Sequence, residues 1–327
     1  GLYILDNIRP LEQLADAMKG EKDVFLFDGP PAIRWQTWGR DNPIGAKEWI
    51  GQNPPLGAMI DFYSKGSAGP ATIQIATAAG QHIRTMVVPV TAGVNRAIWD
   101  LRYDASGAGG APGAAVGRAG GGGRGAGRGA GTGMPAGVPP AQDQAAGRGA
   151  GGGGGGGFGR GGGAPYALPG SYVVTVKVGA TELTRPLAVQ MDPRITVTPA
   201  DLKAQLDAGL ALRDLTDRIN ALISEADSAV AQLTTTSASN AAAARVLDQA
   251  KDFRFRMGRV GQEQGYRIQG RLREEITTLA GSVEANPGAP TAGELVRLKE
   301  VTADLDKMTT DWKAFLAGPA APFVKIS

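Results

Sequence analysis

The hydrophobic periodicity of this chain changes once, at Asp192-Pro193. Before that point, short runs rich in β-branched residues alternate with polar residues at every second position, which is the pattern of half-buried strands. After it, leucine and isoleucine recur at steps of three, four and five residues, which is the pattern of helices with one apolar face. The sequence therefore predicts a multi-domain α+β fold, in which a β region is followed by helices.

Six or seven short strands are expected within residues 58–192. Two of them, at residues 172–178 and 183–189, are joined by a tight Gly-Ala turn. Short strands separated by glycine and proline turns are typical of an antiparallel sandwich of the immunoglobulin (Ig) type. Pro186 has no N–H to donate to a ladder, so the last strand is expected at an edge of its sheet.

A glycine- and arginine-rich segment, residues 104–165, interrupts the β region. Residues 105–164 hold 28 of the chain's 50 glycines, and five arginines against a single acid, Asp143. The rest of the chain is close to neutral, so the isoelectric point of 9.1 describes the insertion and not a basic binding face. Arg-Gly repeats also occur in RNA-binding segments, but only Phe158 offers a ring for stacking here. We expect a disordered loop insertion and no nucleic-acid partner.

The helical region, residues 193–327, is expected to be a hairpin or small bundle. Thr198 supplies an N-cap and Pro199 the first helical position. Thr291 and Glu294 have the spacing of a capping box for the last helix. Four helices are predicted, near residues 202–233, 241–260, 268–283 and 295–316.

The N-terminal part of the chain, residues 1–57, differs from the β and helical regions in its composition and periodicity. Residues 1–6 alternate like a strand and are preceded by neither a methionine nor a signal sequence, so we interpret residues 1–20 as the end of another domain. Residues 21–57 are rich in proline and tryptophan and are expected to be an extended connector. No apolar run approaches the roughly 20 residues that span a bilayer, so no membrane span is expected. The absence of cysteine excludes disulfides and thiolate metal sites.

Several stretches together resemble a family of bacterial exported proteins built on a large β-propeller of BNR-type, sialidase- or sortilin-like repeats. The most specific stretch is AGVNRAIWDLRY at residues 92–103. The others are GLYILDNIRPL at residues 1–11, NPPLGAMIDFY at residues 53–63, LPGSYVV at residues 168–174 and DPR at residues 192–194. The resemblance implies that the chain follows an upstream propeller in the same polypeptide, with residues 1–20 as its last strand and exit turn. It also implies an Ig-like domain, a following helical part, and a secreted or periplasmic location.

Three tryptophans of the connector, Trp35, Trp38 and Trp49, are the candidate site residues. They could stack on a carbohydrate, or they could fasten the connector to a neighbouring domain, because large aromatic rings supply most of the packing area in such segments. The second interpretation is favoured. Trp99 is expected in the core of the sandwich or in a contact between domains, and Trp312 on the apolar face of the last helix.

No arrangement of residues carries a catalytic signature. A glycosidase needs two carboxyl groups at a defined separation, and no spacing links any pair among the candidate acids Asp28, Asp41, Glu48, Asp61, Asp100 and Asp192. His82 is the single histidine and is expected at the surface, so no metal site and no cofactor are expected. Asp100 and Arg102 are expected to make a structural ion pair or turn hydrogen bonds.

Three functions remain open on these grounds. The leading one is a non-catalytic accessory region that stabilises a propeller and aids glycan or protein binding. The second is the C-terminal module of a glycoside hydrolase, of sialidase-like or xyloglucanase-like type, whose active site lies upstream. The third is an adhesion or partner-binding module that acts through its helices.

Overall fold

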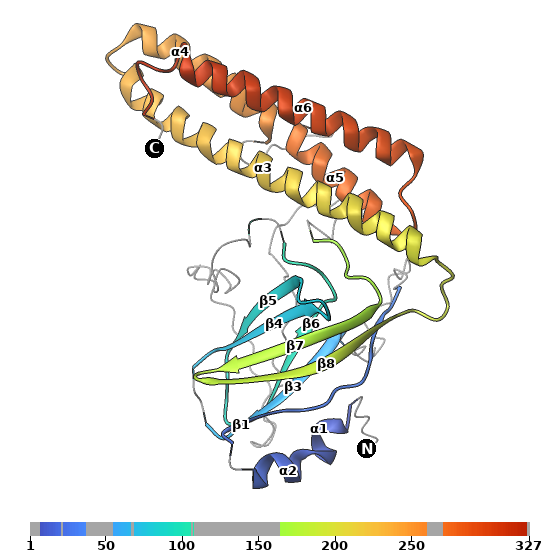
Figure 1. Ribbon diagram of the computed structural model, residues 1–327. Helices are drawn as coiled ribbons and strands as arrows, with labels where there is room; N and C mark the ends of the chain where they lie inside the picture. The colour runs from blue at the N-terminus through green and yellow to red at the C-terminus, as the bar shows by residue number, and fades with distance from the viewer. Residues whose placement is uncertain are drawn as a thin grey trace, which may run out of the picture. The chain divides into compact units, whose positions relative to one another are not determined.

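The computed structural model describes residues 7–20, 22–36, 55–66, 69–105, 107, 164–259 and 271–325. These residues form a mixed α+β fold with two sheets and six helices, as the change of periodicity predicted (Figure 1). The β region comprises the two sheets, which end at Met191, and the helical region begins at Pro199. The expected Gly/Arg-rich loop, apart from its two ends, lies outside the described residues.

The β region contains a three-stranded and a five-stranded sheet. The first has the order β1-β3-β6, with β1 at Val24–Leu26, β3 at Ala58–Ser64 and β6 at Gly93–Trp99. The second has the order β2-β8-β7-β4-β5, with β2 at Ala32–Arg34, β8 at Thr181–Met191, β7 at Gly170–Val178, β4 at Ala71–Thr77 and β5 at His82–Val88. Neighbouring strands are antiparallel, except that β2 and β8 are parallel.

One hydrophobic core is built from residues of both sheets. Ile73 and Ile75 alternate into it along β4, as period-two burial requires. Trp99 is fully buried at the end of β6, meets the Tyr172 ring edge-on with 5.4 Å between centroids, and donates from Nε1 to the Arg102 carbonyl at 2.8 Å. The prediction of Trp99 as a core residue is confirmed.

Two strands come from the segment expected to be a connector. β1 pairs with β3, and β2 pairs with the end of β8, so this part of the chain contributes one strand to each sheet. The edge position expected for the last strand is found around Pro186 but not along the whole of β8. β8 lies between β2 and β7, but β2 covers only residues 189–191, so Pro186 faces no strand of the described chain on that side.

The two ends of the insertion are joined by backbone pairing. Arg102 and Tyr166 form an antiparallel bridge. The Tyr103 N–H donates to the Pro165 carbonyl at 3.0 Å, and the Ala167 N–H donates to the Leu101 carbonyl at 2.8 Å. These contacts form a short stem that closes the loop at its base.

The long helices follow the predicted order. They are α3 at Pro199–Ser237, α4 at Ala241–Met257, α5 at Leu272–Ala285 and α6 at Ala292–Ala317, and they are preceded by the short helices α1 at Arg9–Glu12 and α2 at Leu14–Lys19. In Figure 1, α4 and α5 run back along α3, and α6 then returns in the direction of α3.

The N-termini of α3 and α6 are capped by the residues that the sequence indicated. The Thr198 side chain accepts from the Asp201 N–H at the start of α3. Thr291 and Glu294 form the complete capping box of α6, in which each side chain accepts a hydrogen bond from the other residue's backbone N–H. A second hydrophobic core lies among α3–α6, and Trp312 is fully buried in it, as predicted.

Candidate functional site

Trp35, the first of the three candidate tryptophans, lies just after β2 and is 44% exposed. The Arg194 guanidinium lies over its ring, 5.4 Å from the centroid. Trp38 and Trp49 lie outside the described residues.

Asp192 and Arg194 hold the chain next to Trp35. The buried Asp192 carboxylate accepts from the Arg194 Nε at 2.8 Å and from the Gln36 backbone N–H at 3.1 Å. Arg194 also donates from Nη2 to the Gln36 carbonyl at 3.2 Å. Hydrogen bonds from Arg194 hold the pKa of Asp192 far below its ordinary value. These hydrogen bonds fix the backbone beside Trp35. The Asp192 carboxylate, the one carboxylate among these groups, is ion-paired with Arg194.

Two of the other candidate acids, Asp61 and Asp28, are also paired with arginines. Asp61 is buried under an Arg96 ion pair at 2.7 Å and accepts from Asn7 at 3.0 Å, whereas Asp28 is exposed and pairs with Arg185 at 2.9 Å. Asp41 and Glu48 lie outside the described residues. Among the described candidate acids, Asp28, Asp61 and Asp192 are each ion-paired with a different arginine.

His82 is exposed, as predicted, and its Nε2 lies 2.7 Å from the Asp104 carboxylate. Asp104 also accepts from the Thr85 backbone N–H at 3.2 Å and faces Arg84 at 3.9 Å. The pair thus joins β5 to the base of the insertion. Within the described ranges, no group of three or more His, Cys, Asp or Glu side chains is placed to hold a metal ion.

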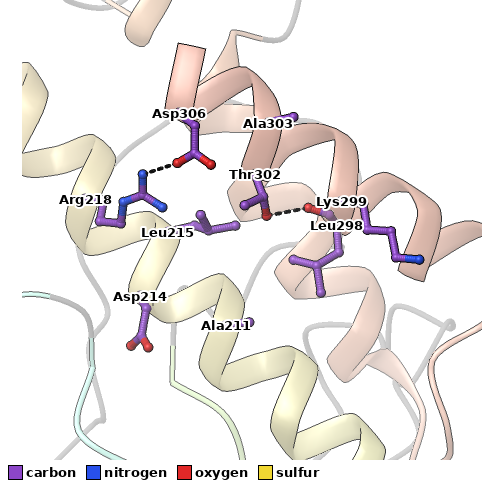
Figure 2. A pocket seen from close by; sticks show the side chains of 9 residues that line it. All are labelled: Ala211, Asp214, Leu215, Arg218, Leu298, Lys299, Thr302, Ala303 and Asp306. Carbon is purple, nitrogen blue, oxygen red and sulfur yellow. Dashed lines mark hydrogen bonds and ion pairs between the residues drawn. The ribbon is translucent and has the colours of Figure 1, made fainter. Parts of the chain in front are cut away.

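A groove of about 490 Å³ lies between α3 and α6 (Figure 2). Its lining includes Leu215 and Leu298, together with the ion pair of Arg218 with Asp306 at 2.5 Å. Lys299 lies on the α6 side of the same groove. The groove mixes apolar and oppositely charged side chains, and of its two aspartates Asp306 is ion-paired with Arg218.

A more distinctive surface lies at α1 and α2. Pro10 and Ala17 are buried, but Ile8, Leu11 and Met18 are 52%, 57% and 60% exposed. These three residues, which we call the apolar patch, lie on or next to helices too short to be stable alone. A helical segment that buries some apolar residues and exposes others of this size is suited to lie between two surfaces.

The junction between the β and helical regions is polar. The Tyr166 ring has two guanidinium carbons over it, that of Arg34 at 4.3 Å from the centroid and that of Arg102 at 3.6 Å. Arg102 pairs with Glu284 of α5 at 2.5 Å, and Arg34 donates to Gln205 of α3 at 3.2 Å. Burial lowers the pKa of Arg34 and raises that of Glu284, because charged groups lose hydration there.

Sequence reasoning missed this junction. Of the two alternatives expected for Asp100 and Arg102, the turn hydrogen bond is confirmed, because the Arg102 backbone N–H donates to the Asp100 carboxylate at 3.2 Å. The contact of the Arg102 guanidinium with Glu284 of α5 was not expected. Arg102 and Glu284 are 182 positions apart, and no local pattern links them.

Within the described residues, no helix is long and apolar enough to cross a membrane, which agrees with the sequence. Comparison with protein-family models, with curated proteins and with solved structures found no match to this chain.

Proposed function

We propose that this chain is a non-catalytic accessory region of an exported β-propeller protein, and that it packs on the propeller and stabilises it. In this proposal the β region is an Ig-like sandwich, the helices form a small bundle attached to it, and the propeller lies upstream in the same polypeptide. The resemblance of residues 92–103 and of the four other stretches to the propeller family is the reason for proposing a propeller as the upstream domain.

The observation that carries the proposal is the apolar patch at α1 and α2. Ile8, Leu11 and Met18 are each more than half exposed, and side chains of this size gain most from burial against another surface. Asn7 and Asp61 connect the start of this segment to β3, so a domain that covers the patch would be coupled to the β region.

The first test compares a protein that contains both the propeller and this chain with its patch variant Leu11→Ser/Met18→Ser. We expect the variant to lower the melting temperature of the propeller while leaving that of residues 1–327 alone nearly unchanged. The matched control is Leu295→Ser/Val296→Ser, which removes exposed apolar side chains of α6. An equal effect of both variants on the propeller would contradict the proposal.

The second test addresses the glycoside hydrolase alternative. Residues 1–327 alone should hydrolyse no fluorogenic glycoside, and turnover that disappears in an Asp192→Asn or Asp61→Asn variant would assign catalysis to this chain. Trp35→Ala should then be compared with the wild type for retardation by soluble polysaccharides in native gels. A retardation that this variant abolishes would add glycan binding to the accessory role.

A further inference from the structure

The β and helical regions have separate hydrophobic cores. Among the described residues, Leu206 is the one buried side chain of the long helices that belongs to the core of the β region, and Leu210 packs against its border. Most other buried apolar residues of α3–α6 form the second core. Two bodies joined by so little apolar contact are expected to move relative to each other unless other interactions prevent it.

The polar junction supplies such interactions around the last turn of α5. Gln205 of α3 donates from Nε2 to the Val283 and Asn286 carbonyls, both at 2.7 Å. These carbonyls belong to the end of α5, where backbone acceptors have no partner within the helix. Gln205 Oε1 meanwhile accepts from Arg34 of β2, so one buried side chain connects α3, α5 and the β region.

Charge complementarity points to the same turn. The C-terminus of a helix carries a partial negative charge, and Glu284 adds a full one. Arg34 and Arg102 approach it from the β region with the Tyr166 ring against both guanidinium groups, and Arg102 donates to both Glu284 and the Ala164 carbonyl. The side chains of Arg102 and Glu284 are only 18% and 11% exposed, so neither charge is well hydrated if its partner is lost.

We propose that the last turn of α5, with Arg34, Arg102, Tyr166 and Gln205, forms a polar latch that makes the β and helical regions move as one body. When the latch is closed, Arg102 is ion-paired with Glu284 and Arg34 donates to Gln205. When either member of the Arg102–Glu284 pair is neutralised, the remaining buried charge gains more from water than from the junction, and the latch opens. This inference does not depend on the proposed propeller, because it concerns only residues within the chain.

The chain has no cysteine, so a pair of spin labels can be introduced without background. Suitable sites are Lys177 of β7 and Lys313 of α6, which are exposed and lie on different sides of the junction. Pulsed electron paramagnetic resonance then measures the distribution of distances between the two regions. We expect a narrow distribution in the wild-type background and a broad or two-component one in the Glu284→Gln and Arg102→Met variants.

Matched controls remove exposed ion pairs elsewhere in the helices. Glu300→Gln breaks the Arg297–Glu300 pair, and Arg218→Met breaks the pair with Asp306. Both controls should keep the narrow distribution. Hydrogen exchange gives a second readout: amides in the last turn of α5 should exchange about tenfold faster in the latch variants, while those in the centre of β7 should not change.

The distance distributions and the circular dichroism of the latch variants together support or overturn the latch. A distribution as narrow in both latch variants as in the wild type would overturn the latch. So would a loss of helical or strand signal in circular dichroism, because it would show that the pair is needed to fold one region and not to couple the two. Broadening in the latch variants with both signals intact supports it.

Discussion

Gly209, in the first half of α3, lies so close to Pro165 that a Cβ at residue 209 would be 2.8 Å from the Pro165 Cβ. Glycine within a helix normally costs about 1 kcal/mol relative to alanine. Its presence here lets α3 approach the stem of the insertion closely. The glycine is therefore explained by packing between α3 and the β region, not by a break in the helix.

Gly209→Ala should destabilise the chain by about 1–3 kcal/mol, because the new methyl group overlaps a rigid proline ring and the overpacking outweighs the gain in helix propensity. The control is Gly281→Ala in α5, where nothing lies within 4 Å of the new Cβ. That variant should be more stable than the wild type by about 1 kcal/mol. Denaturant unfolding measures both, and a stabilising Gly209→Ala would contradict the close approach.

Asp192 should make stability depend on pH at the acid end. Its pKa is depressed in the folded chain, so its contribution is present above the unfolded value of about 4 and is lost as the pH falls through the folded value. Asp192→Asn should lower the melting temperature at pH 7, and the melting temperature of this variant should fall less steeply than that of the wild type below about pH 4. Asp207→Asn, which removes an exposed pair with Lys203, should leave the acid dependence as in the wild type.

Tyr172 should make the stability of the chain depend on pH at the alkaline end of the range. Burial raises the pKa of its phenol to about 12, and its hydroxyl donates to the Leu168 carbonyl at 2.6 Å. Because the folded pKa is raised, the contribution of the neutral phenol is complete below about pH 10 and is lost as the pH rises toward 12. Tyr172→Phe should cost about 1 kcal/mol at pH 8 and remove part of the alkaline loss, as followed by thermal unfolding. An unchanged alkaline profile would assign that loss to other groups.

Trp99 and Trp312 are both fully buried, but within the described chain only one of the two indole N–H groups is used. Trp99 donates to the Arg102 carbonyl, whereas Trp312 Nε1 has no hydrogen-bond partner among the described residues. Replacement by phenylalanine removes similar volume at each site. Trp99→Phe should therefore cost more free energy of unfolding than Trp312→Phe, by about 1 kcal/mol, since it leaves a carbonyl unpaired. Equal costs in denaturant unfolding would show that the Trp99 hydrogen bond contributes little.

The long elements could be predicted because their signals are local. The leucine stripe of α3, its Thr198 cap and the Thr291 capping box each lie within a few turns of chain. β1 and β2 could not be predicted from periodicity, because three residues are too few to show alternation. Their strand character depends on partners more than 30 residues away.

The candidate site residues were chosen by residue type, and not by a pattern along the chain. Trp35 was singled out by residue type, and the structure places it at the surface beside Arg194. The junction was missed because Arg34 and Gln205 are 171 positions apart and each is unremarkable in its own segment. The pairing of β2 with β8 brings the Arg34 strand to the start of the helices.

The stem at Arg102 and Tyr166 has a consequence for how the chain tolerates change. Its backbone pairs hold residues 101–103 and 165–167 beside each other, between the end of β6 and the start of β7. The entropy of closing a loop grows only by about 0.6 kcal/mol for each doubling of its length. We therefore expect that peptides or whole domains inserted in place of residues 108–163 leave the register of the flanking strands unchanged.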